Sequence, residues 1–341
     1  MKIRLDYLLM WIVFGARWRE KLWVTRGDKE SLENQMLIST TPILIDRWGL
    51  NSVKVEIQSE FPCFNPSIVK SATGYTVVTR SSNLINLNDG NYFYKSPPHR
   101  TINYILELDN QFQLISQAAL NDSAVTFMGS AAEMGIEDIR LFKWRDTVWA
   151  CGAGLHGLGP ETQIGVQQIL CRLDNNCLLD PLVFDSPYGN KVEKNWMPLV
   201  HTNSLSFAYG LSPLEIFQVV DGKLNNGKFS KGNLRTKNAE DYKLRGGTPF
   251  IRWKNVYLGV AHSAYIHRHG KRYYVHYFIV LNNELQIQEV SEPFFIQRKG
   301  TEFASGLELD EESVILAYGV ADRGCRIVRI PDSIVEKYIT L

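Results

Sequence analysis

A short motif recurs about five times along this chain, and this recurrence constrains the fold more than any other feature. Each copy has a small or polar residue, usually beside a Pro, then an alternating apolar strand, a tight turn and a second strand. The copies begin at Asn65, Glu137, Asn195, Gly247 and Ala304, and their second strands end at Arg80, Gly152, Gly210, Ser263 and Gly319. Repeats about 50 to 70 residues apart that each hold several short strands are typical of a β-propeller. The sequence therefore predicts an all-β ring of blades.

Equivalent positions of separate repeats converge in such a ring, because the innermost strand of every blade points its end at one central funnel. Seven charged or polar residues occupy these positions in different copies: Arg80, Asp138, Arg140, Lys194, Arg245, His262 and Tyr318. We therefore expect a shared site at the funnel. The turn-rich segment 84–100 is long enough to be an insertion over the funnel mouth that carries substrate contacts.

The domain organisation follows from these boundaries. Residues 1–55 are expected to form an N-terminal extension with closing strands. The segment 36–61, which crosses this boundary, alternates well enough to be strands. Residues 56–330 are expected to form the catalytic propeller, and residues 331–341 a C-terminal tail packed on it or closing it. A chain of 341 residues is compatible with a single closed unit of this kind.

The composition limits which partners and which cellular location we expect for this protein. A net charge of +1 argues against a nucleic-acid surface. Five cysteines without metal-ligand spacing favour a reducing, cytoplasmic location. The apolar run Tyr7–Gly15 is about half of what a spanning helix needs, so we expect no transmembrane segment. A signal peptide, or a peripheral membrane contact through this run, remains an alternative.

The second repeat opens on the strongest catalytic candidate. Glu137, Asp138 and Arg140 lie together at the inner start of this blade. An Asp among apolar neighbours tends to have a raised pKa and can serve as a general acid, so we expect Asp138 to be catalytic. The alternative is a turn-forming Asp paired with Arg140.

Cations dominate the other funnel positions. Lys194 and Arg245, the latter beside two glycines, are suited to an anion, although each could also be a solvated or turn residue. Inverting hydrolysis needs a second carboxylate, which Glu302, Asp322 or Asp89 could supply, but the basic excess favours phosphate or the diphosphate of a sugar nucleotide. The histidines His267, His269 and His276 lack an accompanying acid or Cys at useful spacing, so no metal is expected.

Six fragments together resemble glycoside hydrolase family 130, the five-bladed propellers that include β-mannoside phosphorylases and related mannosyltransferases. They read FNPSI with TVVTR, GIEDIR, EKNW, RGGTPF, YLGVAHS and EFASGLELDEESVILAYGVAD, and they cover about residues 60 to 325. The resemblance implies a five-bladed β-propeller with about four antiparallel strands per blade. It also implies an enzyme that acts on an oligosaccharide or glycan with no cofactor, and with inorganic phosphate or a nucleotide sugar as co-substrate.

The resemblance implies individual roles as well. Asp138 matches the family's proton donor, which acts on the glycosidic oxygen through a sugar hydroxyl. Phosphate or the nucleotide sugar would be bound by Arg140, Lys194 and His262, with Tyr274 as a further contact, and we add Arg245 from its position. The sugar of the innermost subsite would contact Asn65 and Arg80, and we assign Glu137, Tyr318 and Asp322 to sugar binding as well.

Two departures of this sequence from the family pattern leave the choice between a sugar phosphate and a sugar nucleotide as glycosyl donor open. Ile139 stands where the family usually has Pro, and the stretch that begins EKNWMPLV differs from the version in characterised phosphorylases. We expect an inverting enzyme that moves a mannose-like unit in a phosphorylase-like reaction. A sugar-nucleotide-dependent glycosyltransferase is the first alternative, a non-catalytic glycan-binding propeller the second, and a pure hydrolase the third.

Overall fold

The computed structural model describes residues 26–87, 89–90, 92–95, 99–126, 132–157, 164–189, 192–225, 243–266 and 270–339. The apolar run Tyr7–Gly15 lies outside the described residues, as do His267 and His269. The part of the chain up to Ser39 forms a unit distinct from Thr40–Leu341. The described residues of the first unit, 26–39, belong to helix α2 (Arg26–Thr40).

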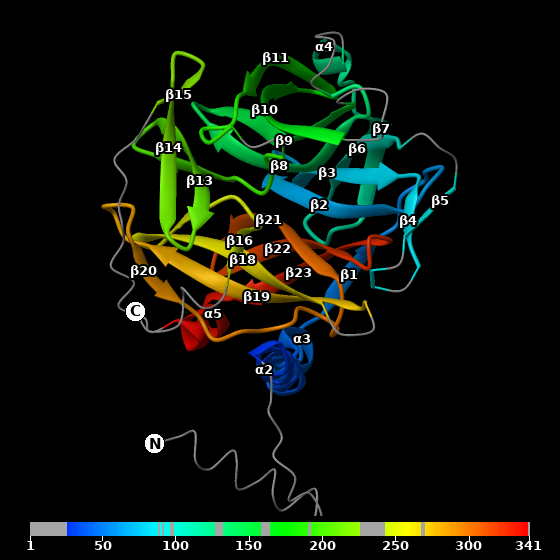
Figure 1. The fold of residues 1–341 in the computed structure, drawn as a ribbon. Helices are drawn as coiled ribbons and strands as arrows, with labels where there is room; N and C mark the ends of the chain where they lie inside the picture. The colour runs from blue at the N-terminus through cyan, green and yellow to red at the C-terminus, as the bar shows by residue number, and fades with distance from the viewer. Residues whose placement is uncertain are drawn as a thin grey trace, which may run out of the picture. The chain divides into compact units, whose positions relative to one another are not determined.

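The second unit is a five-bladed β-propeller, as the repeats and the resemblance predicted (Figure 1). Blade 1 contains β2 (Cys63–Lys70), β3 (Tyr75–Ser82), β6 (Thr101–Leu108) and β7 (Leu114–Ala119). Blade 2 contains β8 (Ile136–Trp144), β9 (Thr147–Gly157), β10 (Ile164–Asp174) and β11 (Cys177–Phe184). Blade 3 contains β12 (Met197–His201), β13 (Ser204–Leu211), β14 (Leu214–Val220) and β15 (Lys223–Asn225).

The inner edge of blade 4 is split between two short strands. These are β16 (Arg245–Gly246) and β17 (Ile251–Trp253), which both pair with β18 (Val256–Ile266), followed by β19 (Arg272–Leu281) and β20 (Ile287–Val290). Blade 5 contains β21 (Glu302–Asp310), β22 (Ser313–Val320) and β23 (Gly324–Pro331), with β1 (Ser52–Val55) as its outer strand. Strand β1, blue in Figure 1, runs antiparallel to the red β23, so the two ends of the propeller are joined within one sheet.

The strands expected between residues 36 and 61 are only partly present. Residues 36–40 end helix α2, and residues 44 and 45 begin helix α3 (Leu44–Trp48), so only the stretch around Val53 is a strand. Short apolar runs have the same appearance in a helix and in a strand, which explains the error. After β23 the chain forms helix α5 (Asp332–Tyr338), whose Asp332 accepts a hydrogen bond from Trp253 Nε1 at 2.9 Å.

The core lies between adjacent blades. Leu258 and Val280 of blade 4 belong to one buried cluster with Leu316 of blade 5, whereas Val78 and Leu141 belong to a cluster between blades 1 and 2. Close approach near the axis requires glycine. A Cβ on Gly306 would lie 2.7 Å from the backbone nitrogen of Ile68. This packing fixes the inner strands, and with them the side chains at their ends.

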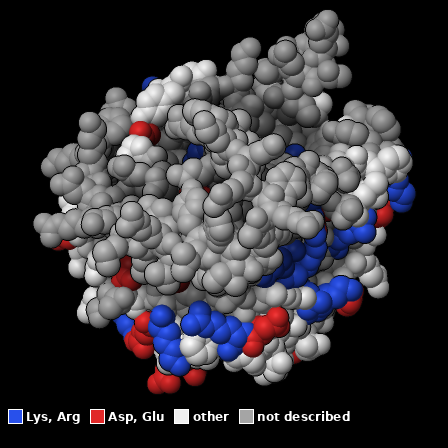
Figure 2. Space-filling model, turned by 60° about the horizontal axis from the view of Figure 1, so that its bottom comes forward, with Lys and Arg blue, Asp and Glu red and all other residues white. Residues whose placement is uncertain are grey.

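Three further features of the described residues concern membrane-spanning helices, cysteine pairing and surface charge. In the described residues, no helix combines the length and the apolar character needed to cross a bilayer. The five cysteines are all unpaired, and only Cys177 is not buried. On the face in Figure 2, Lys and Arg side chains are interspersed with Asp and Glu along the lower edge.

Candidate active site

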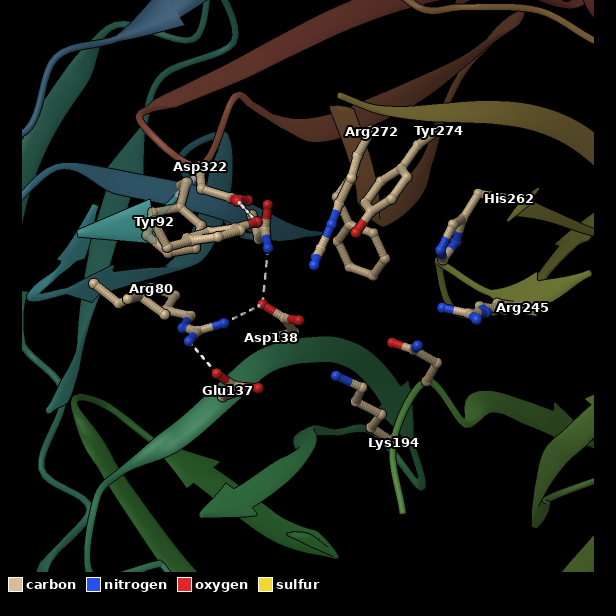
Figure 3. A pocket seen from close by; sticks show the side chains of 15 residues that line it. Arg80, Tyr92, Glu137, Asp138, Lys194, Arg245, His262, Arg272, Tyr274 and Asp322 are labelled. Carbon is tan, nitrogen blue, oxygen red and sulfur yellow. Dashed lines mark hydrogen bonds and ion pairs between the residues drawn. The ribbon is translucent and has the colours of Figure 1, made fainter. Parts of the chain in front are cut away.

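All five blades contribute to one cavity of about 460 Å³ at the inner ends of their strands (Figure 3). Nine of the residues predicted from the sequence line it: Asn65, Arg80, Glu137, Asp138, Lys194, Arg245, His262, Tyr274 and Asp322. Phe64, Leu84, Tyr92, Asn195, Arg272 and Phe303 complete the wall. Of the seven residues expected to converge from the repeats, five line this cavity, whereas Arg140 and Tyr318 do not.

Three blades begin with a residue in the left-handed backbone conformation. Asn65, Asp138 and Asn195 stand at the starts of the inner strands of blades 1, 2 and 3, and their φ values are 51°, 49° and 66°. Asn and Asp tolerate this left-handed conformation better than other residues with a side chain. In blades 1 and 2 the strand pairing also shifts at this position. The local break in strand geometry brings three short polar side chains to the cavity.

Asp138 is held at the centre of the site. Its Oδ1 accepts hydrogen bonds from Asn65 Nδ2 at 2.8 Å and from Arg80 Nη1 at 3.2 Å, and Arg80 also pairs with Glu137. Burial favours a raised pKa for Asp138, but the guanidinium groups of Arg80 and Arg140 and the Asn65 hydrogen bond outweigh it. The pKa of Asp138 is therefore lowered, so the raised value expected from the sequence is wrong.

Three cations face this carboxylate, and none of them has an acidic partner within the part of the chain that the structure describes. Among the described carboxylates, none lies within ion-pair distance of Lys194, Arg245 or Arg272. In Figure 3, Lys194 approaches the cavity from one side, Arg272 from the opposite side, and Arg245 lies beyond them next to His262. Unpaired cations around a cavity are a typical anion-binding arrangement, because an anion gains charge-assisted hydrogen bonds there.

His262 contributes to this wall as a neutral group. Burial, and then the neighbouring His276 and Arg245, hold its pKa well below the usual value. Its ring packs at 5.0 Å from Tyr274 and 5.2 Å from Phe303, measured between ring centroids. Within the described residues its Nδ1 is buried and has no hydrogen-bond partner. His262 is thus suited to hydrogen bonding and not to supplying charge.

Asp322 forms the opposite corner of the cavity with two residues of the predicted insertion. Its Oδ2 accepts hydrogen bonds from Tyr92 Oη at 2.9 Å and from Asn86 Nδ2 at 3.2 Å. Burial raises the pKa of Asp322, and Asp138 acts in the same direction. Of the three carboxylates considered for a second catalytic position, Asp322 alone lines the cavity.

Arg140 does not line the cavity, which corrects its assignment to anion binding. Its side chain is fully buried, and it donates hydrogen bonds to the Gly247 carbonyl at 2.9 Å, the Asp138 carbonyl at 2.8 Å and Asn195 Oδ1 at 3.2 Å. These protein acceptors occupy the guanidinium that was expected to bind a ligand. Arg140 instead fixes the backbone of Asp138 and joins blades 2, 3 and 4.

Tyr318 is also absent from the cavity wall, and strand register explains why. Arg80 pairs with Phe64 in blade 1, and the equivalent pair in blade 5 is Gly319 with Phe303. Tyr318 is one residue earlier, so its side chain lies on the other face of the strand. It is buried in the core, where its hydroxyl bonds Ser52 Oγ at 2.7 Å and Gln297 Oε1 at 2.9 Å.

The other two candidate carboxylates have structural partners. Glu302 is fully buried and accepts hydrogen bonds from the backbone N–H groups of residues 296 to 298. Asp89 is bound by Arg298 and by the N–H of Thr301. Neither carboxylate lines the cavity.

Two of the missed residues had a signal in the sequence. Arg272 stands two positions before Tyr274 in a strand, and side chains two apart share a face. Asn195 occupies the same place in its repeat as Asn65. Tyr92 comes from a turn-rich insertion whose pairing has no sequence signature. No cluster of His, Cys, Asp and Glu suited to a metal ion occurs among the described residues.

By fold, the protein is a five-bladed propeller like those of glycoside hydrolase family 130. A β-1,2-mannobiose phosphorylase from Listeria innocua aligns with a TM-score of 0.55 at 12% identity, over 83% of this chain and 95% of that one. Two Leishmania mexicana proteins also align at 12% identity. One is a mannose phosphorylase, with a TM-score of 0.54 over 89% of this chain and 92% of that one. The other is a GDP-Man-dependent mannosyltransferase, with a TM-score of 0.51 over 84% of this chain and 92% of that one. No protein-family model and no curated protein matches the sequence.

Proposed function

We propose that the protein is a carbohydrate-active enzyme that transfers a mannose-like glycosyl unit with inversion between a glycan and an anionic co-substrate. The observation that carries this proposal is the position of Asp138 opposite Lys194, Arg245 and Arg272, which lack acidic partners within the described residues. A carboxylate can exchange a proton with a sugar oxygen, and the cations can bind the phosphoryl group that attacks or leaves.

In the phosphorolytic direction, Asp138 in its acid form donates a proton to the glycosidic oxygen through a sugar hydroxyl. A phosphate oxygen attacks the anomeric carbon from the opposite face. The bond to the departing sugar breaks, the bond to phosphate forms, and Asp138 is left as a carboxylate. The proton that phosphate loses returns to Asp138 through solvent, so the products are a sugar 1-phosphate and a shortened glycan.

The remaining wall supports a neutral sugar beside this reacting centre. Asn65, Arg80, Glu137 and Asp322 present amide, guanidinium and carboxylate groups that can hydrogen-bond sugar hydroxyls. Phe64 and Phe303 add apolar surface for the ring. The Listeria innocua protein of similar fold is a phosphorylase that was solved with a mannobiose, which supports the same substrate class here.

A sugar-nucleotide-dependent transferase is the second candidate, and the state of Asp138 favours it. The lowered pKa makes the carboxylate the resting form of Asp138. A carboxylate is ready to accept the proton of an acceptor hydroxyl while the nucleoside diphosphate departs. Phosphorolysis instead requires that bound phosphate first raises the pKa of Asp138, as a neighbouring anion does.

Turnover with separated donors tests both candidates. One series contains mannosides with inorganic phosphate, and release of sugar 1-phosphate is measured. The other contains nucleotide sugars with mannoside acceptors, and release of nucleoside diphosphate is measured. Turnover in the first series supports the phosphorylase and turnover in the second the transferase. Glycan binding without turnover in either, together with unchanged binding by Asp138→Asn, would identify a non-catalytic glycan-binding propeller and overturn the proposal.

A further inference from the structure

Arg272 enters the cavity from a direction that separates it from the other unpaired cations. It begins β19, an interior strand of blade 4, whereas Lys194 and Arg245 lie at the inner edges of blades 3 and 4. In Figure 3 its guanidinium points toward the space above Asp138 from the side of Tyr92 and Tyr274. The cavity thus has cations on two sides of its central carboxylate.

Residues of the insertion between β3 and β6 fix Arg272 in this position. The insertion carries the hairpin of β4 (Leu84–Asn86) and β5 (Tyr92–Tyr94). The Arg272 N–H donates to the Asp89 carbonyl at 2.6 Å, and the guanidinium carbon lies 5.5 Å from the centre of the Tyr92 ring. A Cβ on Gly90 would be 3.2 Å from Arg272 Cγ, so the side-chain stem runs directly along this backbone.

The insertion is itself anchored by an ion pair between the buried carboxylate of Asp89 and the partly exposed Arg298. Asp89 is 4% exposed and accepts hydrogen bonds from Arg298 Nη1 at 3.1 Å and from the Thr301 N–H at 3.0 Å. Lys271 lies 3.7 Å from its Oδ2. The Asp89 carboxylate of the insertion is therefore occupied by Arg298, Thr301 and Lys271, and it does not form an ion pair with Arg272.

The second nearby carboxylate is also occupied. Asp322 accepts hydrogen bonds from Tyr92 and Asn86, and no ion pair joins it to Arg272 within the described residues. Arg140 donates to three protein acceptors, two of which are backbone carbonyls. Arg272 instead rests on the Tyr92 ring and hydrogen-bonds the Tyr274 hydroxyl, which itself lines the cavity. Its guanidinium points into the cavity, and its other planar donors suit a phosphoryl group.

We propose that Arg272 is a specificity-determining residue that binds a phosphoryl group of the co-substrate from the side opposite Lys194. The proposal rests on the proposed function, because it assigns part of the same anion site. A phosphoryl group reaches this position either as free phosphate held between the two sides or as one half of a diphosphate that spans them. A diphosphate would contact Arg272 through one of its phosphoryl groups and the opposite side of the cavity through the other.

Anion binding to the purified full-length protein tests the assignment without any turnover. Inorganic phosphate and pyrophosphate are titrated by calorimetry into wild type, Arg272→Gln and Arg272→Lys. Arg252→Gln is the matched control, because Arg252 also lies over a tyrosine ring, at 4.9 Å from Tyr257, but is exposed and does not line the cavity. We expect Arg272→Gln to weaken at least one anion about 10- to 100-fold, Arg272→Lys to weaken it less, and the control to leave it unchanged.

The two anions distinguish the two sources of the phosphoryl group. A loss for both anions indicates a single phosphate held between the two sides, and a loss confined to pyrophosphate indicates a diphosphate. Affinities of Arg272→Gln within about twofold of wild type for both anions, or an equal loss in Arg252→Gln, would overturn the proposal. Anion binding that depends on Arg272 in a protein without turnover would leave this proposal standing while the proposed function fails.

Discussion

Replacing Asp138 by Asn tests the catalytic assignment most directly, because the structure separates its chemical role from its structural one. The amide oxygen of Asn can still accept from Asn65 Nδ2 and Arg80 Nη1, which lie 2.8 and 3.2 Å from Oδ1 in the native protein. Asn also tolerates the φ of 49° at this position. Arg80 keeps its ion pair with Glu137. The variant should therefore fold, but it cannot exchange a proton.

The expected magnitudes follow from these contacts. Loss of general acid or base catalysis should lower kcat by about 10²- to 10⁴-fold in Asp138→Asn. Affinity for phosphate should stay the same or rise, because a negative charge leaves the anion site. Asp138→Ala should in addition destabilise the fold by about 3 kcal/mol, which combines about 1 kcal/mol for a left-handed Ala with about 1 kcal/mol for each donor left without its acceptor.

Steady-state kinetics with the active donor and thermal unfolding measure the two effects separately. Asp146→Asn is a matched control, since Asp146 lies in the same blade with a φ of 56° and is exposed in the turn after β8. It should retain wild-type kcat. A loss of less than about tenfold in kcat for Asp138→Asn would refute the assignment of Asp138 as the proton-transfer group.

Three further predictions follow. Tyr318→Phe should lower stability by about 1 kcal/mol in chemical denaturation and leave kcat and KM unchanged, because its hydroxyl bonds only structural partners; a rise in KM for the glycan would contradict this. Burial raises the pKa of Glu302 to about 8, so the native state retains a proton that the unfolded state releases, and stability should fall as the pH rises from about 5 to about 8. Glu302→Gln should flatten that slope, and an unchanged slope would refute the cause. If phosphorolysis occurs, saturating phosphate should move its alkaline limb to higher pH, because the bound anion raises the pKa of Asp138; a limb that does not move with phosphate would argue against this coupling.

The repeats predicted the ring because every blade carries its own strand pair with the same start and end. That is why the sequence alone assigns Asp138, Lys194 and His262, from three different blades, to one cavity. The prediction failed at Tyr318, because a shift of one residue along a strand moves a side chain from the cavity face to the core face. It also failed at Arg140, whose partner carbonyl on Gly247 is 107 residues away in the sequence. Side-chain partners at such separations have no local pattern.

The site departs from regular strand geometry at the residues that form it, and this explains which of them sequence reasoning can find. Asn65, Asp138 and Asn195 share a left-handed backbone at equivalent points of three repeats, so repetition reveals them although strand alternation does not. Arg272 begins the third strand of blade 4, and Tyr92 lies on the insertion that packs against it, so neither stands in the first or second strand of a repeat, where the recurring motif lies. Repeated positions thus provide the central carboxylate and its supports. We expect the unrepeated insertion to determine what else the cavity binds, and specificity should therefore respond to changes in Arg272 and Tyr92 more than to changes in the ring.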